Sequence, residues 1–213
     1  YYFPIFEEAL AKQNVPLEIK YLAVVESALN PKAVSRVGAT GLWQFMPYTA
    51  KSEGMHIGSY IDERKDVYKS TEFAADFLRK LYTNHGNDWF LALAAYNSGS
   101  GNVSKAIRNS QGYDFWTIKH RLPRETQSYV PSYIAIFYCM YYSSDYNLFP
   151  DKPQFSFSNT TRERIYDPLS LKHLAEVVGS CEEELLQYNP SLKRGIIPAS
   201  ANGFDLVLPK QYL

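Results

Sequence analysis

The sequence predicts a mainly α-helical domain followed by a small α+β domain. Between residues 5 and 141, apolar residues recur every three or four positions, which is the spacing of helices with a buried face. Residues 143–160 are rich in Asn, Asp, Pro and Ser, as linkers are. The remaining chain has the order strand, helix, helix, strand. We therefore predict domains at 1–145 and 161–213, joined by a linker at 146–160, and 213 residues suffice for both.

Two helices are predicted before residue 31. The first covers residues 5–13 and is short and amphipathic. The second begins at Pro16, which suits a first helical position, and stops at Asn30-Pro31. Glu26 lies near its end, and its face is mostly apolar because it is shared by Leu22, Ala23, Leu29 and Asn30.

This environment gives Glu26 a possible chemical role. A carboxyl group with apolar neighbours loses hydration, which raises its pKa from the reference value of about 4.3. A pKa of roughly 6 would suit a general acid near neutral pH. The alternative from the residues alone is a solvated Glu26 paired with Lys20 or Arg36.

Residues 30–40 are expected to form a loop. Gly41 then permits a tight turn or the close approach of another group. Gln44 is expected on the next helical turn, where its amide can both donate and accept hydrogen bonds. Taken alone, such a Gln is an ordinary surface residue.

Two helices are predicted in the middle of the chain. Ser70 or Thr71 is expected to cap the first, and Gly86 to end it. The second covers residues 88–96, is apolar nearly all round and should be the buried centre of the domain. Its last turn presents Tyr96 and Asn97, either toward a cleft or as packing and capping groups.

Two more helices complete the first domain. Asn102 is expected to cap a helix over residues 102–109. Pro123 precedes the last one, which Pro131 should kink or restart. Glu125 lies in its first turn, where a carboxylate offsets the helix dipole, although it is also a candidate second carboxylate.

The small domain follows the linker. A first strand is expected over residues 161–166, although few of them are apolar. Ser170 caps a helix that Gly179 ends, a second helix covers residues 183–188, and a strand covers residues 204–208.

Composition narrows the function classes. Twenty-two basic and 22 acidic residues leave no net charge, so nucleic acid is not an expected partner. No stretch reaches the roughly 20 apolar residues of a membrane span. Cys139 and Cys181 are too few and too far apart for a zinc site, and buried free thiols are favoured over a bridge between the domains. No metal or cofactor is implied.

Four short motifs occur in a fixed order: Glu26-Ser27, Gly41-Leu42-Trp43-Gln44-Phe45-Met46-Pro47, Ala95-Tyr96-Asn97-Ser98-Gly99 and Glu125-Thr126-Gln127-Ser128-Tyr129-Val130-Pro131. Together they resemble the family 1 lytic transglycosylases over about two thirds of the chain. Ser98 stands where that family commonly has Ala or Cys. The resemblance implies a lysozyme-like fold and an enzyme that cleaves peptidoglycan.

The second domain carries a resemblance of its own. Its segment Leu185-Leu186-Gln187-Tyr188-Asn189-Pro190 resembles a LysM module, a family that binds glycans containing N-acetylglucosamine. The membrane-bound lytic transglycosylase D type couples such modules to the catalytic domain. Here the module is expected either to bind glycan or to pack on the first domain.

The resemblance also implies roles for residues. Glu26 would be the catalytic acid and then the base, forming a 1,6-anhydromuramic product without water. Asn97 would bind the sugar acetamido group, while Tyr96 and Tyr129 would lie near Glu26. The full set of expected substrate-binding residues is Ser27, Gln44, Met46, Tyr96, Asn97 and Tyr129.

Two alternatives remain open. A goose-type muramidase would deliver water to the same bond and needs an acidic residue opposite Glu26, with Asp62, Glu63 and Glu125 as candidates. A non-catalytic peptidoglycan-binding protein would rely on the LysM-like module.

The expected partner is therefore the peptidoglycan glycan strand, bound by a monomer in the periplasm. The chain opens abruptly at Tyr1. We expect any secretion signal or lipid anchor to the outer membrane to lie upstream.

Overall fold

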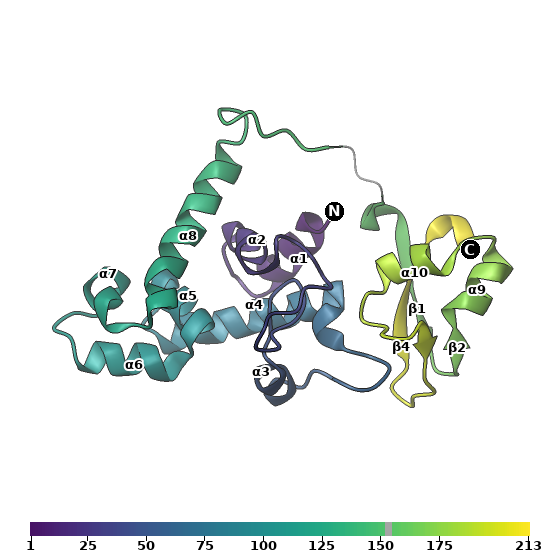
Figure 1. Cartoon of the computed structure of the whole chain (residues 1–213), viewed down its shortest axis with the longest axis horizontal. Helices are drawn as coiled ribbons and strands as arrows, with labels where there is room; N and C mark the ends of the chain where they lie inside the picture. Colours follow the sequence, from purple (N-terminus) through teal and green to yellow (C-terminus); the bar gives the residue numbers. More distant parts are fainter. Residues whose placement is uncertain (152–154) are drawn as a thin grey trace. The chain divides into compact units, whose positions relative to one another are not determined.

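The computed structural model describes residues 1–151 and 155–213, so residues 152–154 of the predicted linker lie outside the described residues. Figure 1 labels the helices and strands. The chain forms two spatial units that do not follow sequence order. Unit 1 contains Tyr1–Ile5, Glu26–Thr71 and Asp151–Leu213, and unit 2 contains Phe6–Val25 and Glu72–Pro150. The predicted boundaries at 145 and 161 stay a prediction.

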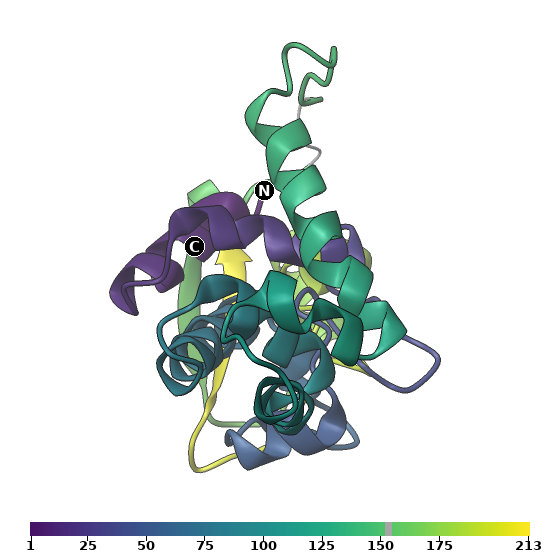
Figure 2. The same ribbon diagram turned by 90° about the vertical axis from the view of Figure 1, so that its left-hand side faces the viewer.

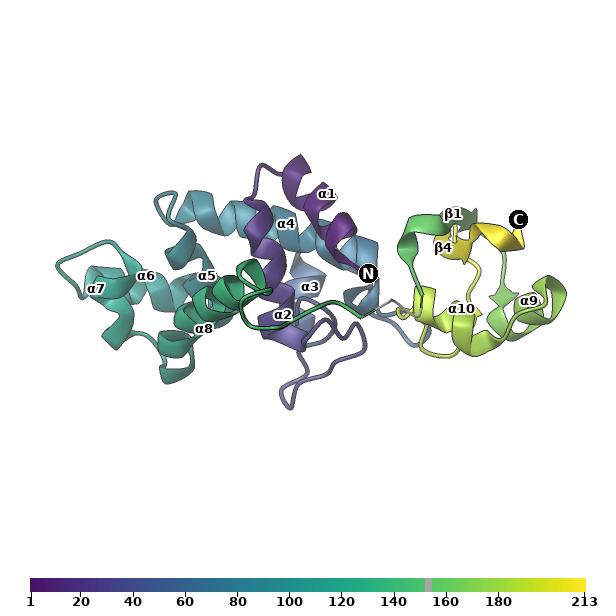
Figure 3. The same ribbon diagram turned by 90° about the horizontal axis from the view of Figure 1, so that it is seen from above.

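Unit 2 is helical. Its elements are α1 (Phe3–Lys12), η1 (Leu17–Tyr21), α2 (Leu22–Ser27), α4 (Val67–Asn84), α5 (Trp89–Ser98), α6 (Ser100–Arg108), α7 (Phe115–Ile118), η3 (Lys119–Arg121) and α8 (Arg124–Tyr141). It shares three of these helices, α1, α2 and α4, with unit 1. Residues 91–95 of α5 are no more than 2% exposed, which confirms the predicted buried centre. Asp88 caps this helix by accepting hydrogen bonds from the backbone N–H groups of Phe90 and Leu91, at 2.7 and 3.0 Å. Helix α8 packs beside α5 (Figure 3).

Helix α8 is continuous through Pro131, so the predicted restart does not occur, and the predicted kink stays a prediction. Val130 and Tyr133, near the proline in sequence, are buried. The last turns of α8 carry the exposed Tyr138 and Tyr141 and extend beyond the helices on which α8 packs, as the green helix in Figure 2 shows.

Both cysteines are free, as predicted, but neither is buried. Cys139 on α8 is half-buried, and Cys181 is exposed. The prediction of buried thiols from apolar sequence neighbours is therefore wrong.

The helix predicted from Pro16 to Asn30 is divided and shorter. A 3₁₀ turn, η1, is followed by α2 (Leu22–Ser27). Ala28 and Leu29 have left-handed φ values of 49° and 61°, which end the helical hydrogen bonding before the expected stop. The catalytic candidate Glu26 therefore lies in the last turn of a short helix.

The predicted caps of two helices are wrong. Helix α4 begins at Val67, and the Oδ1 atom of Asp66 accepts from the backbone N–H groups of Tyr68 and Lys69, at 3.0 and 2.9 Å. Ser70 and Thr71 are instead fully buried inside the helix.

Helix α6 likewise begins at Ser100, two residues before Asn102. Asn102 lies inside α6 and donates from Nδ2 to the carbonyl of Ser98, at 2.8 Å. Thr71 and Asn102 thus each bond a nearby backbone carbonyl, of Val67 and Ser98, rather than capping a helix N-terminus.

The capping carboxyl of Asp66 predicts a pH dependence of stability. Burial raises its pKa from 3.8 to about 6. Below pH 3.8 the group is protonated in both the folded and the unfolded chain. As the pH rises toward about 6, the folded chain holds the proton more tightly, so the free energy of unfolding falls.

Asp66→Asn keeps a capping side chain and removes this titration. The wild type loses this part of its stability between pH 3.8 and pH 7, and the variant does not. The difference in free energy of unfolding, variant minus wild type, should therefore grow by about 2 to 3 kcal/mol over that range, at about 1.4 kcal/mol for each unit by which the pKa is raised. Urea unfolding at a series of pH values measures this gain. Parallel pH profiles for the two proteins would contradict it.

After Tyr1–Ile5, unit 1 contains Glu26 and Ser27 of α2 and two short elements, α3 (Pro47–Ser52) and η2 (Glu63–Lys65). It ends with residues 155–213, which we call the C-terminal module. The elements of this module are η4 (Phe157–Asn159), β1 (Thr160–Ile165), β2 (Leu169–Ser170), α9 (Leu171–Val178), α10 (Glu182–Tyr188), β3 (Ile196–Ile197), β4 (Phe204–Pro209) and η5 (Lys210–Tyr212).

The predicted order strand, helix, helix, strand is confirmed in the C-terminal module. Strands β1 and β4 are antiparallel, with Thr160 opposite Pro209, and Gly179 ends α9 in a left-handed conformation. The short pair β2 and β3 was not predicted, because two residues per strand leave no periodic signal. Buried Asn189 links the layers, since its side chain bonds the backbone N–H and carbonyl of Val207, at 2.9 and 2.8 Å.

Candidate active site

Glu26 lies half-buried in the last turn of α2, after the fully buried Leu22 and Ala23. The hydroxyl of the next residue, Ser27, donates to the carbonyl of Leu42 at 2.9 Å. This bond fixes the end of α2 to the loop that carries the second motif. The raised pKa expected for Glu26 stays a prediction.

The loop of residues 33–46 is not helical at Gln44, so that prediction is wrong. Thr40 and Phe45 exchange backbone hydrogen bonds of 3.1 and 3.2 Å, and Gln44 turns between them with a left-handed φ of 50°. The Nε2 atom of Gln44 donates to the carbonyl of Gly41 at 2.8 Å. We call residues 33–46 the Gln44 loop. Met46 is its last residue, is 39% exposed and precedes Pro47 at the start of α3.

The close approach expected at Gly41 is confirmed. Gly41 has a φ of 90°, and a Cβ atom there would lie 1.8 Å from the backbone oxygen of Arg64. A side chain is therefore excluded, and the Gln44 loop rests directly on the backbone of η2.

In unit 2, helices α5 and α8 bring a second group of predicted residues together. The Oδ1 atom of Asn97 accepts from the hydroxyl of Thr126 at 2.7 Å, and its Nδ2 atom donates to Glu125 at 3.3 Å. Tyr96 precedes Asn97 and packs against the ring of Phe77, with 5.7 Å between the ring centroids. Tyr129 lies one turn after Glu125 on α8 and is 8% exposed.

Thr126 is a site residue that sequence reasoning missed. It is 1% exposed, and its hydroxyl sets the orientation of the Asn97 amide. Its only sequence signal was its place within the fourth motif.

The predicted site residues are divided between the two units. Unit 1 holds Glu26, Ser27, Gln44 and Met46, while unit 2 holds Tyr96, Asn97 and Tyr129.

All three candidate second carboxylates accept hydrogen bonds, and Glu125 accepts one from Asn97. Asp62 is buried and paired with Arg64 at 2.8 Å. Glu63 accepts from the backbone N–H of His56 at 2.7 Å and from Lys69 at 2.5 Å. Glu125 lies in the first turn of α8, as the helix-dipole interpretation predicted.

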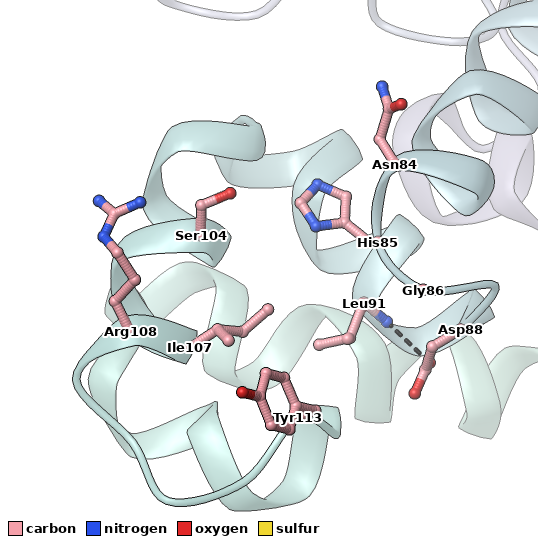
Figure 4. Close-up of a pocket in the computed structure, with 9 residues that line it drawn as sticks. All are labelled: Asn84, His85, Gly86, Asp88, Leu91, Ser104, Ile107, Arg108 and Tyr113. Carbon is pink, nitrogen blue, oxygen red and sulfur yellow. Dashed lines mark hydrogen bonds between the residues drawn. The ribbon is translucent and has the colours of Figure 1, made fainter.

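Unit 2 also contains a pocket of about 420 Å³ (Figure 4). It is lined by Asn84, His85, Gly86, Asp88, Leu91, Ser104, Ile107, Arg108 and Tyr113. Asp88 and Leu91 belong to the start of α5, so the pocket lies at the opposite end of this helix from Tyr96 and Asn97. Burial lowers the pKa of His85 below 6.5, which keeps its ring neutral at pH 7. None of the predicted site residues lines this pocket.

Across the described ranges 1–151 and 155–213, no cluster of three His, Cys, Asp or Glu side chains is arranged to bind a metal ion. Within the same ranges, no helix is long and apolar enough to cross a membrane.

The fold matches solved structures of lytic transglycosylases. The 70 kDa soluble lytic transglycosylase from Escherichia coli matches with a TM-score of 0.56 and 29% identity, over 70% of this chain and 26% of that chain. The complex of the 70-kDa soluble lytic transglycosylase with bulgecin A matches with a TM-score of 0.58 and 29% identity, over 73% and 25% of the two chains. These similarities show that the chain has the lysozyme-like fold of soluble lytic transglycosylases.

Comparison of the sequence with protein families identifies the family of the chain. Residues 3–119, over half of the 213, match the family described as Transglycosylase SLT domain, and the chain belongs to this family. Residues 160–212 match the LysM-like domain of lytic transglycosylase MltD.

Two curated relatives come from Escherichia coli (strain K12). Membrane-bound lytic murein transglycosylase D is 33% identical over 94% of this chain and 44% of its own length. Soluble lytic murein transglycosylase is 32% identical over 66% of this chain and 23% of its own length. This chain therefore spans less than half the length of either relative.

Proposed function

We propose that this chain is a peptidoglycan lytic transglycosylase that cleaves the β-1,4 bond between N-acetylmuramic acid and N-acetylglucosamine without water. The observation that carries the proposal is Glu26, held half-buried at the end of α2 and tied through Ser27 to the Gln44 loop, in a chain of the SLT family. Relatives named as lytic murein transglycosylases support the substrate class.

A single carboxyl group suffices for this reaction. Glu26 gives its proton to the glycosidic oxygen as the bond to the anomeric carbon breaks, and the N-acetyl group assists that departure. The ionised Glu26 then takes the proton of the C6 hydroxyl, whose oxygen closes the 1,6-anhydro ring. One group can act first as acid and then as base, because the proton that it gave is replaced by the one that it takes.

The other predicted residues would hold the sugar. Asn97 suits the acetamido group, because Thr126 and Glu125 fix the orientation of its amide. We assign the same binding role to Ser27, Gln44, Met46, Tyr96 and Tyr129.

A goose-type muramidase is the second candidate. It requires a carboxylate that activates water, and the buried pairing of Asp62 and the two bonds of Glu63 argue against these two residues. Glu125 remains its best candidate. A non-catalytic binding protein is the third, supported by the LysM-like module. Glycan binding by this module, a monomeric state and a periplasmic location with an outer-membrane anchor are parts of the same proposal.

Mass spectrometry of the muropeptides released from purified peptidoglycan tests the proposed function. We expect 1,6-anhydromuramic ends. Reducing ends would instead identify a hydrolase, and retention on the glycan without release would identify a binding protein.

Thr126→Val should reduce the rate of muropeptide release about tenfold, because one hydrogen bond of about 1.4 kcal/mol orients Asn97. The control is Ser128→Ala, which removes an exposed hydroxyl from the same helix and should leave the rate unchanged. Steady-state release from purified peptidoglycan measures both. Equal rates for the two variants would show that Thr126 does not orient a substrate-binding group.

A further inference from the structure

We propose that Arg64, held by Asp62, is a positioning residue that couples the C-terminal module to the Gln44 loop. The inference rests on the proposed function, because it gives the C-terminal module a part in placing residues around the substrate. Every contact that carries it lies within unit 1.

The first link joins the C-terminal module to residues 57–62, which we call the docking segment. The backbone N–H of Asp62 donates to the carbonyl of Ser191 at 2.9 Å, and the N–H of Lys193 donates to the carbonyl of Tyr60 at 2.8 Å. Between these bonds, Ile61 and Leu192 form an antiparallel bridge. The docking segment thus binds the C-terminal module through a short antiparallel bridge between two loop segments.

Apolar packing strengthens this link. Ile61 packs against the hydrophobic core of the C-terminal module, whose members are Leu171, Ala175, Leu185, Leu192, Ile197, Phe204, Leu206 and Leu208. Arg194 of the C-terminal module also lies over the ring of Tyr60, 5.3 Å from its centroid. The C-terminal module is therefore fixed to the docking segment at three consecutive residues of the segment.

The second link is the ion pair of Asp62 and Arg64. The guanidinium donates from Nε and Nη2 to the two carboxylate oxygens of Asp62, at 2.9 and 2.8 Å. The residues are 5% and 6% exposed. Burial raises the pKa of Asp62, but hydrogen bonding and the charge of Arg64 outweigh it and hold the pKa below 3.8. A buried bidentate pair has little geometric freedom, because a displaced partner leaves a charge without compensation.

The third link joins Arg64 to the Gln44 loop. Its Nη1 atom donates to the carbonyl of Gly38 at 2.8 Å and to the carbonyl of Phe45 at 3.1 Å. One nitrogen thus closes both sides of the turn that carries Gln44. Gly41, at the middle of this turn, rests on the backbone oxygen of Arg64.

These links form a continuous path from the C-terminal module toward the catalytic candidate. Asp62 contacts the C-terminal module through its backbone and Arg64 through its carboxylate, and Arg64 holds the loop whose Leu42 accepts a bond from Ser27. Loosening the C-terminal module should therefore loosen the Gln44 loop.

Three variants of the full chain test the coupling. Ile61→Ser weakens the contact with the C-terminal module and leaves the bonds of Arg64 in place. Arg64→Lys keeps the charge but cannot hold two carboxylate oxygens and two carbonyls together. Ile196→Ser is the matched control, because Ile196 is 39% exposed on the C-terminal module and lies in β3, outside the docking contacts.

The first measurement is hydrogen exchange at the backbone amides of Thr40 and Phe45, which bond each other inside the Gln44 loop. Ile61→Ser and Arg64→Lys should each speed exchange on the order of tenfold, while Ile196→Ser should not change it. Unchanged exchange in Ile61→Ser would overturn the coupling, because a displaced C-terminal module would then leave the loop as it was.

The second measurement is the rate of muropeptide release by the two single variants and their double variant. If Ile61 and Arg64 act along one path, the double variant loses no more activity than the worse single variant. Multiplied losses would overturn a shared path. If the wild-type chain cleaves no peptidoglycan, the proposed function is wrong. The coupling is then still decided by the hydrogen-exchange measurement, which does not require cleavage.

Discussion

Glu26→Gln should lower the rate of muropeptide release by at least about 10²- to 10⁴-fold, which is the usual contribution of general acid–base catalysis. Gln has nearly the same shape as Glu but can neither give nor take a proton at the glycosidic oxygen. Glu26 lies in the last turn of α2, beside Ser27, whose bond to Leu42 does not depend on the carboxyl group. The fold should therefore survive the substitution.

The matched control is Glu18→Gln, since Glu18 is an exposed carboxylate in the preceding turn η1. We expect wild-type release from this variant and similar thermal unfolding for all three proteins. Release by Glu26→Gln within tenfold of the wild-type rate would remove Glu26 from the catalytic role, whatever products appear.

The second large effect is expected at Gly41. Gly41→Ala should reduce the free energy of unfolding by at least about 4 kcal/mol, a loss that only severe steric or packing defects cause. The new Cβ atom would meet the backbone oxygen of Arg64 at 1.8 Å, and no side-chain rotation can relieve a clash with backbone. The Gln44 loop would have to move, so cleavage should fall together with stability.

Gly38→Ala separates this clash from backbone strain. Gly38 has almost the same φ, 88°, but a Cβ atom there would meet nothing within 4 Å. Its cost should be only the about 1 to 2 kcal/mol of a left-handed non-glycine residue. Guanidinium unfolding of both variants measures the difference, and equal losses would mean that the loop does not rest on Arg64.

The helices were the most predictable part of the fold. The run of apolar residues at 91–95 predicted the buried α5, and Gly179 predicted the end of α9. Both signals are local, because a helix fixes contacts between residues three and four apart in sequence. The motif residues of the candidate site were also found from local sequence, by resemblance.

The Gln44 loop was not predictable in the same way. Its turn is held by Arg64, which lies 19 residues after Phe45 and 26 after Gly38, and no local pattern reveals such a contact. The sequence did not predict Asp66 as the cap of α4, because Ser70 and Thr71 can also cap a helix and lie closer to the apolar residues that begin at Phe73. Thr126 was hidden because its role depends on Asn97, 29 positions away.

The joint between the docking segment and the C-terminal module has an evolutionary consequence. Its backbone hydrogen bonds run from the N–H groups of Asp62 and Lys193 to the carbonyls of Ser191 and Tyr60. Every residue type supplies the carbonyl, and every type except proline supplies the N–H. Outside the packed Ile61 and the ion-paired Asp62, point substitutions can therefore accumulate while the joint persists. An insertion or deletion of one residue between Tyr60 and Asp62 would shift the register, so that the carbonyl of Tyr60 and the N–H of Asp62 could not both reach their partners. Lineages should accordingly keep the length of this segment constant and vary in residue identity at its positions other than Ile61 and Asp62.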